Sequence, residues 1–163
     1  NIGSKSSTIV AYGKSQEFFT RELNIAGHSF TKEVMEKNNI DYEQAEKMKL
    51  DLGVKSISAS SEDESTEFSI QVSEKTVLSN LIDELRKSLR YYMKSNPQAF
   101  FNTIYLTGGS AKLIGLKDYI SSELNSKVEL LDPLEKISLE GSSDLVNSYQ
   151  YSVAVGLALR GLK

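Results

Sequence analysis

The sequence predicts an α/β protein with a mixed sheet and a small inserted α+β unit, and three observations lead to this prediction. Residues 7–12 and 17–25 are runs of β-branched and aromatic residues separated by a Gly-Lys-Ser turn, which is typical of a β-hairpin. Residues 74–95 repeat apolar side chains at three- and four-residue spacing, the pattern of an amphipathic helix. Residues 104–109 form a short apolar strand that ends in two glycines.

Composition narrows the range of functions. The 163 residues suffice for one core or for two lobes that share one, and a net charge of −3 offers no general attraction for nucleic acid. Without cysteine the chain has no disulfide, no thiol catalysis and no Cys-ligated zinc, and a single His28 provides no histidine cluster. No apolar run approaches the roughly 20 residues of a membrane span, and no signal-peptide pattern is present. The absence of cysteine fits a reducing compartment.

Residues 27–73 are expected to form the inserted unit. A first helix follows Gly27 and ends near residues 38–39, and a second covers residues 42–52. Asp41 is the expected N-cap of the second helix, and Gly53 is expected to stop it. Residues 54–57 and 67–72 are expected to form a strand pair, joined by the polar, acidic loop 58–65.

The remaining elements alternate between helix and strand. The long helix is stopped at Asn96-Pro97, and the strand into the glycine pair is followed by a helix at 115–124 and a strand at 127–131. A loop begins at Asp132-Pro133, and residues 141–143 are expected to be flexible. A final helix is expected over 145–160, where small residues at alternate positions permit close packing on a sheet.

Three short segments carry candidate chemistry. A glycine pair at the end of a strand, Gly108-Gly109, lets a backbone approach a ligand closely, although an ordinary turn has the same pattern. The Gly3-Ser4-Lys5-Ser6 loop can form an anion-binding nest of backbone N–H groups or simply start a hairpin. Glu46 and Lys49 share one helix face, either as part of a site or as a solvated ion pair.

Together these segments, in this order, resemble the C-terminal half of the actin-like ATPase superfamily. Within it the chain most resembles the type IV pilus assembly PilM family and, next, the FtsA cell-division family. The resemblance covers essentially the whole chain. It rests on Ile104 to Gly109 followed by Gly115-Leu116 and Tyr119, on Val128 to Pro133, and on Ala154 to Arg160.

The resemblance implies a fold and a division into domains. It implies the second half of an actin-like (ribonuclease H-like) ATPase fold, with an N-terminal half expected outside this chain. Residues 1–26 and 96–163 would form subdomain IIA. Residues 27–95 would form the inserted subdomain IIB and the returning long helix.

The resemblance also implies a site for ATP and Mg²⁺. Gly3, Ser4, Lys5 and Ser6 would form the second phosphate loop. Glu46 and Lys49 would flank the ribose and adenine, and the adenosine wall would comprise Gly108, Gly109, Ser110 and Lys112. Asn1 stands where the family usually has Asp, so it would reach Mg²⁺ only through water. No residue qualifies as a water-activating base, and we expect weak or absent ATPase activity from this chain.

The function implied is that of a nucleotide-binding scaffold for type IV pilus assembly at the inner face of the cytoplasmic membrane. The implied partner is the cytoplasmic peptide of a pilus inner-membrane protein, bound through the other half. Membrane association would come only through partners, self-association is possible, and no nucleic acid is expected. Two alternatives stay open: an FtsA-like filament protein of cell division, and an interaction module whose nucleotide site has decayed.

Overall fold

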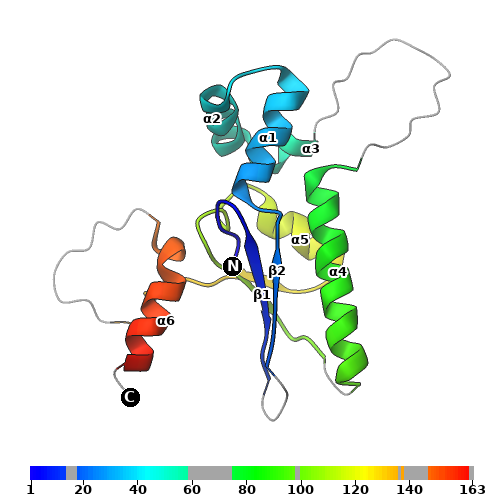
Figure 1. Cartoon of the computed structure of the whole chain (residues 1–163), viewed down its shortest axis with the longest axis vertical. Helices are drawn as coiled ribbons and strands as arrows, with labels where there is room; N and C mark the ends of the chain where they lie inside the picture. Colours follow the sequence, from blue (N-terminus) through cyan, green and yellow to red (C-terminus); the bar gives the residue numbers. More distant parts are fainter. Residues whose placement is uncertain (14–17, 59–74, 98–99, 136, 138–146, 162–163) are drawn as a thin grey trace.

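The computed structural model describes residues 1–13, 18–58, 75–97, 100–135, 137 and 147–161. Figure 1 shows the helices α1, α2 and α3 grouped at one end, the β1–β2 hairpin running toward the other end with α4 beside it, and α6 standing to one side. The elements in chain order are β1 (Ser7–Ala11), β2 (Phe19–Leu23), α1 (Gly27–Asn38), α2 (Tyr42–Leu52), α3 (Val54–Ser58), α4 (Val77–Ser95), β3 (Ile104–Leu106), α5 (Leu116–Leu124), β4 (Val128–Leu130), the 3₁₀ helix η1 (Ser148–Tyr151) and α6 (Ser152–Gly161).

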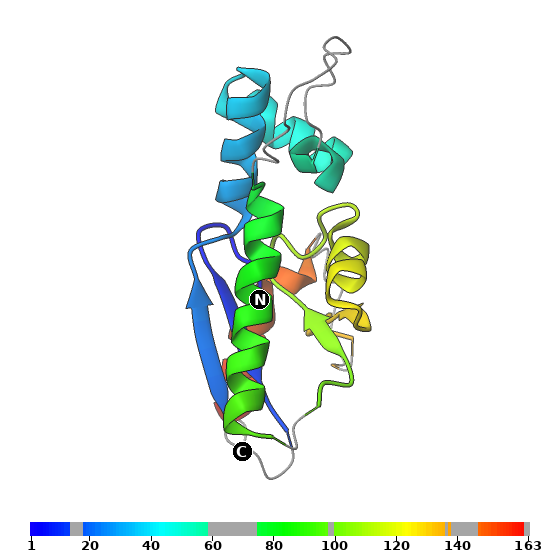
Figure 2. The ribbon, with the colours of Figure 1, turned by 90° about the vertical axis from the view of Figure 1, so that its right-hand side faces the viewer.

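The predicted hairpin strands are confirmed, and α4 packs along them. β1 and β2 are antiparallel, with Ser7 opposite Leu23. Arg21 of β2 reaches α4, where its guanidinium donates to Ser88 Oγ at 3.1 Å and pairs with Glu84 at 2.6 Å. Figure 2 shows α4 lying along the hairpin. The turn at residues 14–17 lies outside the described residues.

The predicted strand–helix–strand unit near the C-terminus is also confirmed. β3 and β4 are parallel, with Ile104 opposite Val128, and α5 makes the crossover that parallel strands require. In the described residues the strands form two separate two-stranded sheets. Ile2 joins the second sheet to the start of the chain, because its N–H donates to Thr107 O at 2.7 Å and its carbonyl accepts from Ser110 N–H at 3.0 Å.

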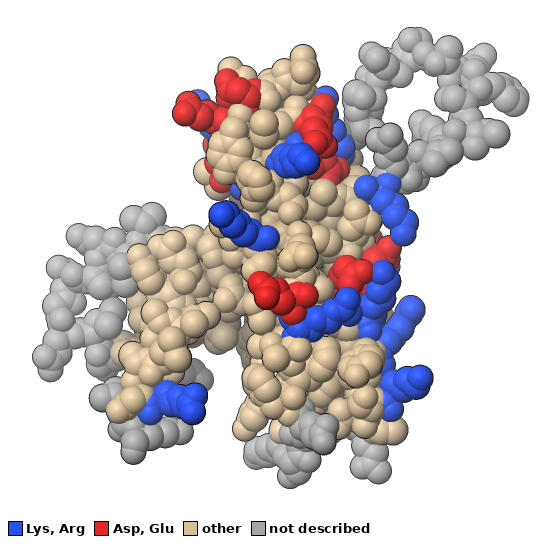
Figure 3. Space-filling view, in the orientation of Figure 1, with Lys and Arg blue, Asp and Glu red and all other residues tan. Residues whose placement is uncertain are grey.

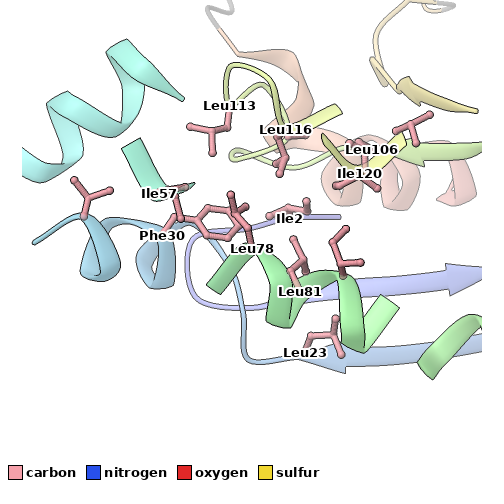
Figure 4. Close-up of a cluster of buried hydrophobic side chains, with 14 of the residues drawn as sticks. Ile2, Leu23, Phe30, Ile57, Leu78, Leu81, Leu106, Leu113, Leu116 and Ile120 are labelled. Carbon is pink, nitrogen blue, oxygen red and sulfur yellow. The ribbon is translucent and has the colours of Figure 1, made fainter. Parts of the chain in front are cut away.

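One buried cluster connects all of these parts (Figure 4). Phe30 of α1, Leu81 of α4 and Leu116 of α5 are at most 1% exposed, so three elements from different parts of the chain meet in the same core. The labelled members of the cluster are Ile2, Leu23, Phe30, Ile57, Leu78, Leu81, Leu106, Leu113, Leu116 and Ile120. The two predicted subdomains therefore share a core, while the boundary between them stays a prediction.

Helix ends follow the predicted capping signals. The Asp41 carboxylate accepts from Gln44 N–H at 2.9 Å at the start of α2, and Gly53 ends that helix with φ of 63°. α4 begins at Val77, later than the predicted residue 74, after a cap that was not predicted: the Thr76 hydroxyl accepts from Ser79 N–H at 3.1 Å. Its stop at Asn96 is confirmed.

The predicted strand at residues 54–57 is wrong, because this segment is the helix α3. Val54 and Ile57 are three residues apart, a spacing that places both on one helix face, and Ile57 is fully buried. Val54 N–H donates to Ile114 O at 2.9 Å, so a tertiary contact holds the start of α3. Burial of Ile57 outweighs the β propensity of a short segment. The predicted partner strand 67–72 and residues 59–65 of the loop lie outside the described residues.

The predicted packing of the last helix on a sheet is wrong as well. No residue of α6 is buried, and a Cβ at Gly156 would meet no atom within 4 Å. The helix is held at its first turn, where the Ser152 hydroxyl is hydrogen-bonded to Thr107 Oγ1 and donates to Tyr149 O at 2.8 Å. Figure 1 shows the rest of α6 standing to one side of the β1–β2 hairpin. The predicted start at residue 145 and the loop 141–143 lie outside the described residues.

Candidate functional site

A cavity of about 150 Å³ lies between α2 and the segment that follows β3. It brings together predicted site residues that are far apart in the sequence: Glu46 and Lys49 from α2, and Gly109, Ser110 and Lys112 from the segment after β3. The remaining lining residues are Phe30, Leu50, Leu113, Ile114 and Asn147. Two of the three predicted segments thus form one concave surface.

Lys49 is buried and fully engaged within the protein. Its Nζ donates to Glu46 Oε2 at 2.7 Å, to Thr31 Oγ1 at 2.9 Å and to Gly27 O at 3.4 Å. The Lys49 side chain is 7% exposed, so the Glu46–Lys49 pair is an ion pair with a buried cation, and it ties α2 to α1. This arrangement leaves the apolar stem of Lys49, and not its charge, available to the cavity.

Glu46 is held in its charged form. Burial acts to raise the pKa of its carboxyl, but hydrogen bonds from Lys49 and Thr31, with the Lys49 charge, outweigh burial and bring the pKa below its ordinary 4.5. The Thr31 hydroxyl lies 2.5 Å from Glu46 Oε2. Since the side chain is 34% exposed, the carboxylate can still accept hydrogen bonds from a ligand in the cavity.

The two glycines after β3 have different roles. Gly108 has φ of 97°, and a Cβ there would lie 2.3 Å from Asn1 Oδ1 and 2.5 Å from Ile2 O. The nearest atom to a Cβ on Gly109 is Gln150 Cβ at 4.0 Å, and Gly109 lines the cavity. Gly108 is therefore required by backbone packing inside the protein, and Gly109 is the glycine that a ligand would meet.

The predicted phosphate loop adjoins the cavity through Ser110. The Ser110 hydroxyl donates to Gly3 O at 2.9 Å, and Gly27 N–H donates to the same carbonyl at 3.0 Å. His28 N–H donates to Ser4 O at 2.7 Å. These bonds place the loop at the N-terminus of α1, beside the wall of the cavity.

The loop itself is a tight turn with outward N–H groups. Gly3 N–H donates to Ser6 O at 3.0 Å and closes the turn. Within the described ranges, the N–H groups of Ser4, Lys5 and Ser6 make no backbone hydrogen bond, and Ser4 and Lys5 are exposed. A turn with free N–H groups and a lysine is suited to an anion.

Asn1 packs beside this loop. Its N–H donates to Thr8 O at 2.9 Å, and its carbonyl accepts from Thr8 N–H at 2.8 Å. Within the described ranges, His, Asp and Glu side chains do not gather in threes as possible metal ligands. An amide such as Asn1 is a neutral oxygen donor, so any Mg²⁺ here would depend on other ligands.

Asn147 and Lys112 complete the far side of the cavity. Asn147 Nδ2 donates to Gly109 O at 3.3 Å, while its Oδ1 is buried with no hydrogen-bond partner among the described residues. Lys112 Nζ lies 4.9 Å from the centroid of the Tyr149 ring, a cation–π contact. The sequence reasoning missed Asn147 because it belongs to no motif. It also missed Thr31, which lies one helical turn after Gly27.

The segment that carries Asn147 is held by Asp132. Its carboxylate accepts from Leu134 N–H at 2.9 Å and from the Ser148 hydroxyl at 2.7 Å. These two bonds hold the pKa of Asp132 below its ordinary value. A charged Asp132 thereby fixes the position of Ser148, next to Asn147, at neutral pH.

The solved structures that are similar to this fold include the following two. A chain of a structure described as "PilM-PilN type IV pilus biogenesis complex" matches with 27% sequence identity and a TM-score of 0.74, over 99% of this chain and 44% of that chain. The ethanolamine utilization protein EutJ from Carboxydothermus hydrogenoformans matches with 17% identity and a TM-score of 0.60, over 98% of this chain and 46% of that one. The chain therefore spans less than half of either relative. A search of curated proteins found no match.

The fold defines a class: this is an actin-like α/β protein, as predicted from the sequence. A family model described as "Type IV pilus assembly protein PilM" matches residues 1–162. The chain accordingly belongs to the type IV pilus assembly PilM family. Among the residues described, none of the helices combines the length and apolar character that crossing a membrane requires.

Proposed function

We propose that this chain provides one wall of an ATP cleft in an actin-like scaffold of type IV pilus assembly. The observation that carries the proposal is the cavity itself, which joins Glu46 and Lys49 of α2 to Gly109, Ser110 and Lys112. Family membership supports the pilus role. The cleft is inferred from the chemistry of these side chains.

The size of the cavity agrees with a shared cleft. Its volume of about 150 Å³ is below the roughly 300–1,000 Å³ of most small-molecule sites. It accommodates part of a nucleotide, and the rest would contact a second half of the protein. Such a bridging ligand would shift the balance between open and closed arrangements of the two halves, because it contacts both halves only when they are closed.

The available groups fit a nucleoside and its phosphates. The exposed edge of the Glu46 carboxylate would accept from ribose hydroxyls, and the unpaired Asn147 Oδ1 would accept from an exocyclic amino group. The N–H groups of the Ser4–Ser6 turn and the Lys5 ammonium would bind phosphate oxygens. Mg²⁺ would supply charge neutralisation at those phosphates when bound.

Hydrolysis is not part of the proposal. Asn1 would reach Mg²⁺ only through water, since its amide carries no charge. Glu46, the acidic side chain of the cavity, is already engaged by Lys49 and Thr31. We expect ATP binding by the full-length protein with weak or absent turnover by the residues of this chain.

The direct test replaces Gly109 with valine in the full-length protein. Calorimetry should give a micromolar Kd for ATP with Mg²⁺, about −8 kcal/mol. Gly109→Val should weaken binding by at least about tenfold, because two methyl groups would occupy the cavity wall. Gly109→Ala adds less bulk and is the matched control, expected to retain most of the affinity.

The same calorimetry also tests the alternative that this chain is an interaction module whose nucleotide site has decayed. In that alternative Glu46 and Lys49 would only tie α1 to α2. Saturating ATP would then give no heat and no rise in unfolding temperature in the unaltered protein. That result would overturn the nucleotide proposal and leave the family membership intact.

We propose further that the full-length protein is cytoplasmic and binds the cytoplasmic peptide of a pilus inner-membrane protein. The solved PilM-PilN complex supports this proposal. The partner groove would lie in the half of the fold outside this chain. Pull-down with peptides of pilus inner-membrane proteins and of division proteins tests the assignment. Capture by division peptides alone would favour the FtsA-like alternative.

A further inference from the structure

One end of the molecule exposes a group of aromatic side chains that the proposed cleft does not use. Tyr12, Phe18, Tyr91 and Phe100 are 82%, 66%, 62% and 78% exposed. Figures 1 and 2 both show the far end of the β1–β2 hairpin beside the C-terminal end of α4. The Phe19 and Tyr91 rings are 5.8 Å apart, so the hairpin and α4 are in contact here. We call these four exposed residues the aromatic end.

Cations border the aromatic end. Arg90 and Lys94 are exposed on the last turns of α4, and neither forms an ion pair with another described residue. Figure 3 shows Lys and Arg side chains along the α4 side of the molecule. Asp83 and Glu84 lie at least one turn closer to the start of α4, and Glu84 is already paired with Lys87 at 2.6 Å. This end is therefore locally basic in a chain whose net charge is −3.

We propose that the aromatic end, with Arg90 and Lys94, is a docking surface for an anionic phospholipid bilayer. Aromatic side chains are favourable at the level of lipid headgroups, where the ring leaves water. Arginine and lysine keep their charge in water while their stems cover apolar surface, and they are attracted to anionic lipids. Large exposed rings beside unpaired cations have the composition of an interfacial surface.

The position of this surface favours a bilayer over a peptide. The described cavity lies by α2, which Figure 1 shows at the opposite end of the molecule from the aromatic end. The exposed rings come from the residue after β1, the residue before β2, the last turns of α4 and the segment after α4. They are spread over one end and do not follow a single strand or helix that a peptide could extend. Two cations and a few rings give reversible binding, not permanent anchoring.

The test is co-sedimentation of the full-length protein with vesicles of phosphatidylcholine alone or mixed with phosphatidylglycerol. Binding is expected to require phosphatidylglycerol and to fall with added salt. Arg90→Gln with Lys94→Gln should reduce the partition coefficient about 25-fold, because each cation near an anionic surface contributes about fivefold. Tyr12→Ser with Phe18→Ser should also reduce it.

The matched control is Lys32→Gln with Lys47→Gln, which removes the same charge from α1 and α2 at the other end. That variant should bind vesicles like the unaltered protein. The proposal is overturned by equal binding to both vesicle types, by no binding, or by full binding of the Arg90/Lys94 variant. Sedimentation velocity tests whether a second copy of the protein occupies this surface instead. If the unaltered protein binds no vesicles but self-associates, and the Arg90/Lys94 variant does not self-associate, the surface is assigned to a second copy.

Discussion

Gly108→Ala is expected to lower the free energy of unfolding by about 3–4 kcal/mol. Gly108 has φ of 97°, which an alanine adopts only with strain, and a new Cβ would lie 2.5 Å from Ile2 O. That carbonyl cannot move freely, because it accepts the hydrogen bond from Ser110 N–H at 3.0 Å. Urea denaturation followed by circular dichroism measures the loss.

The neighbouring glycine provides the control. A Cβ on Gly109 has its nearest neighbour at 4.0 Å, so Gly109→Ala should change stability by no more than about 0.5 kcal/mol. Comparing the unfolding free energies of the two variants therefore distinguishes a glycine needed for packing from a glycine that faces the cavity. Equal losses in the two variants would contradict the distinct roles assigned to them.

Glu46→Gln is expected to destabilise the protein by about 2 kcal/mol at pH 7. The substitution keeps an oxygen for Thr31 and Lys49 to donate to, but it removes the charge that balances a Lys49 side chain only 7% exposed. Of the two hydrogen bonds from Lys49 Nζ, at 2.8 and 2.7 Å, one is lost because the amide nitrogen of glutamine cannot accept it, and the other becomes a bond to a neutral oxygen. Denaturation at a series of pH values measures the effect.

The contribution of Glu46 to the free energy of unfolding should decrease as the pH falls. The folded pKa of Glu46 is lowered from 4.5, so its stabilising contribution is complete above pH 4.5 and is lost as the pH falls through the folded value. The difference between Glu46→Gln and the unaltered protein should therefore close in acid. Glu36→Gln is the control, since the exposed pair of Lys32 and Glu36 is 3.6 Å apart and should contribute almost nothing. A pH-independent loss at Glu46 would argue against the charge as its cause.

Elements governed by neighbouring residues were predictable. The helix α2 is an example, because Asp41 and Gly53 act on the backbone next to them and the helix period spans the residues between. The segment 54–57 was not predictable, because four residues fit either a strand or a helix turn. Its helix is decided by burial of Ile57 and by the bond between Val54 and Ile114, a residue distant in the sequence.

In the candidate site, too, the local sequence predicts some features and tertiary packing decides others. The three-residue spacing of Glu46 and Lys49 predicts a shared face, but only the packing of α1 against α2 buries Lys49, which donates to Thr31. The glycine pair was predicted as one wall. Its separation into a packed Gly108 and an open Gly109 depends on where Asn1 and Ile2 lie.

By itself the sequence determined the class, the helix ends, the hairpin strands, the spacing of the candidate site residues and the resemblance to the actin-like superfamily. The resemblance rests on matched sequence motifs, and the other features follow from local dihedral preferences, capping and side-chain periodicity. The tertiary structure alone decided that α3 is a helix, that α6 stands apart, that Asn147 reaches the cavity and that aromatic rings meet unpaired cations at one end. These features depend on contacts between segments far apart in the chain, which no local pattern encodes.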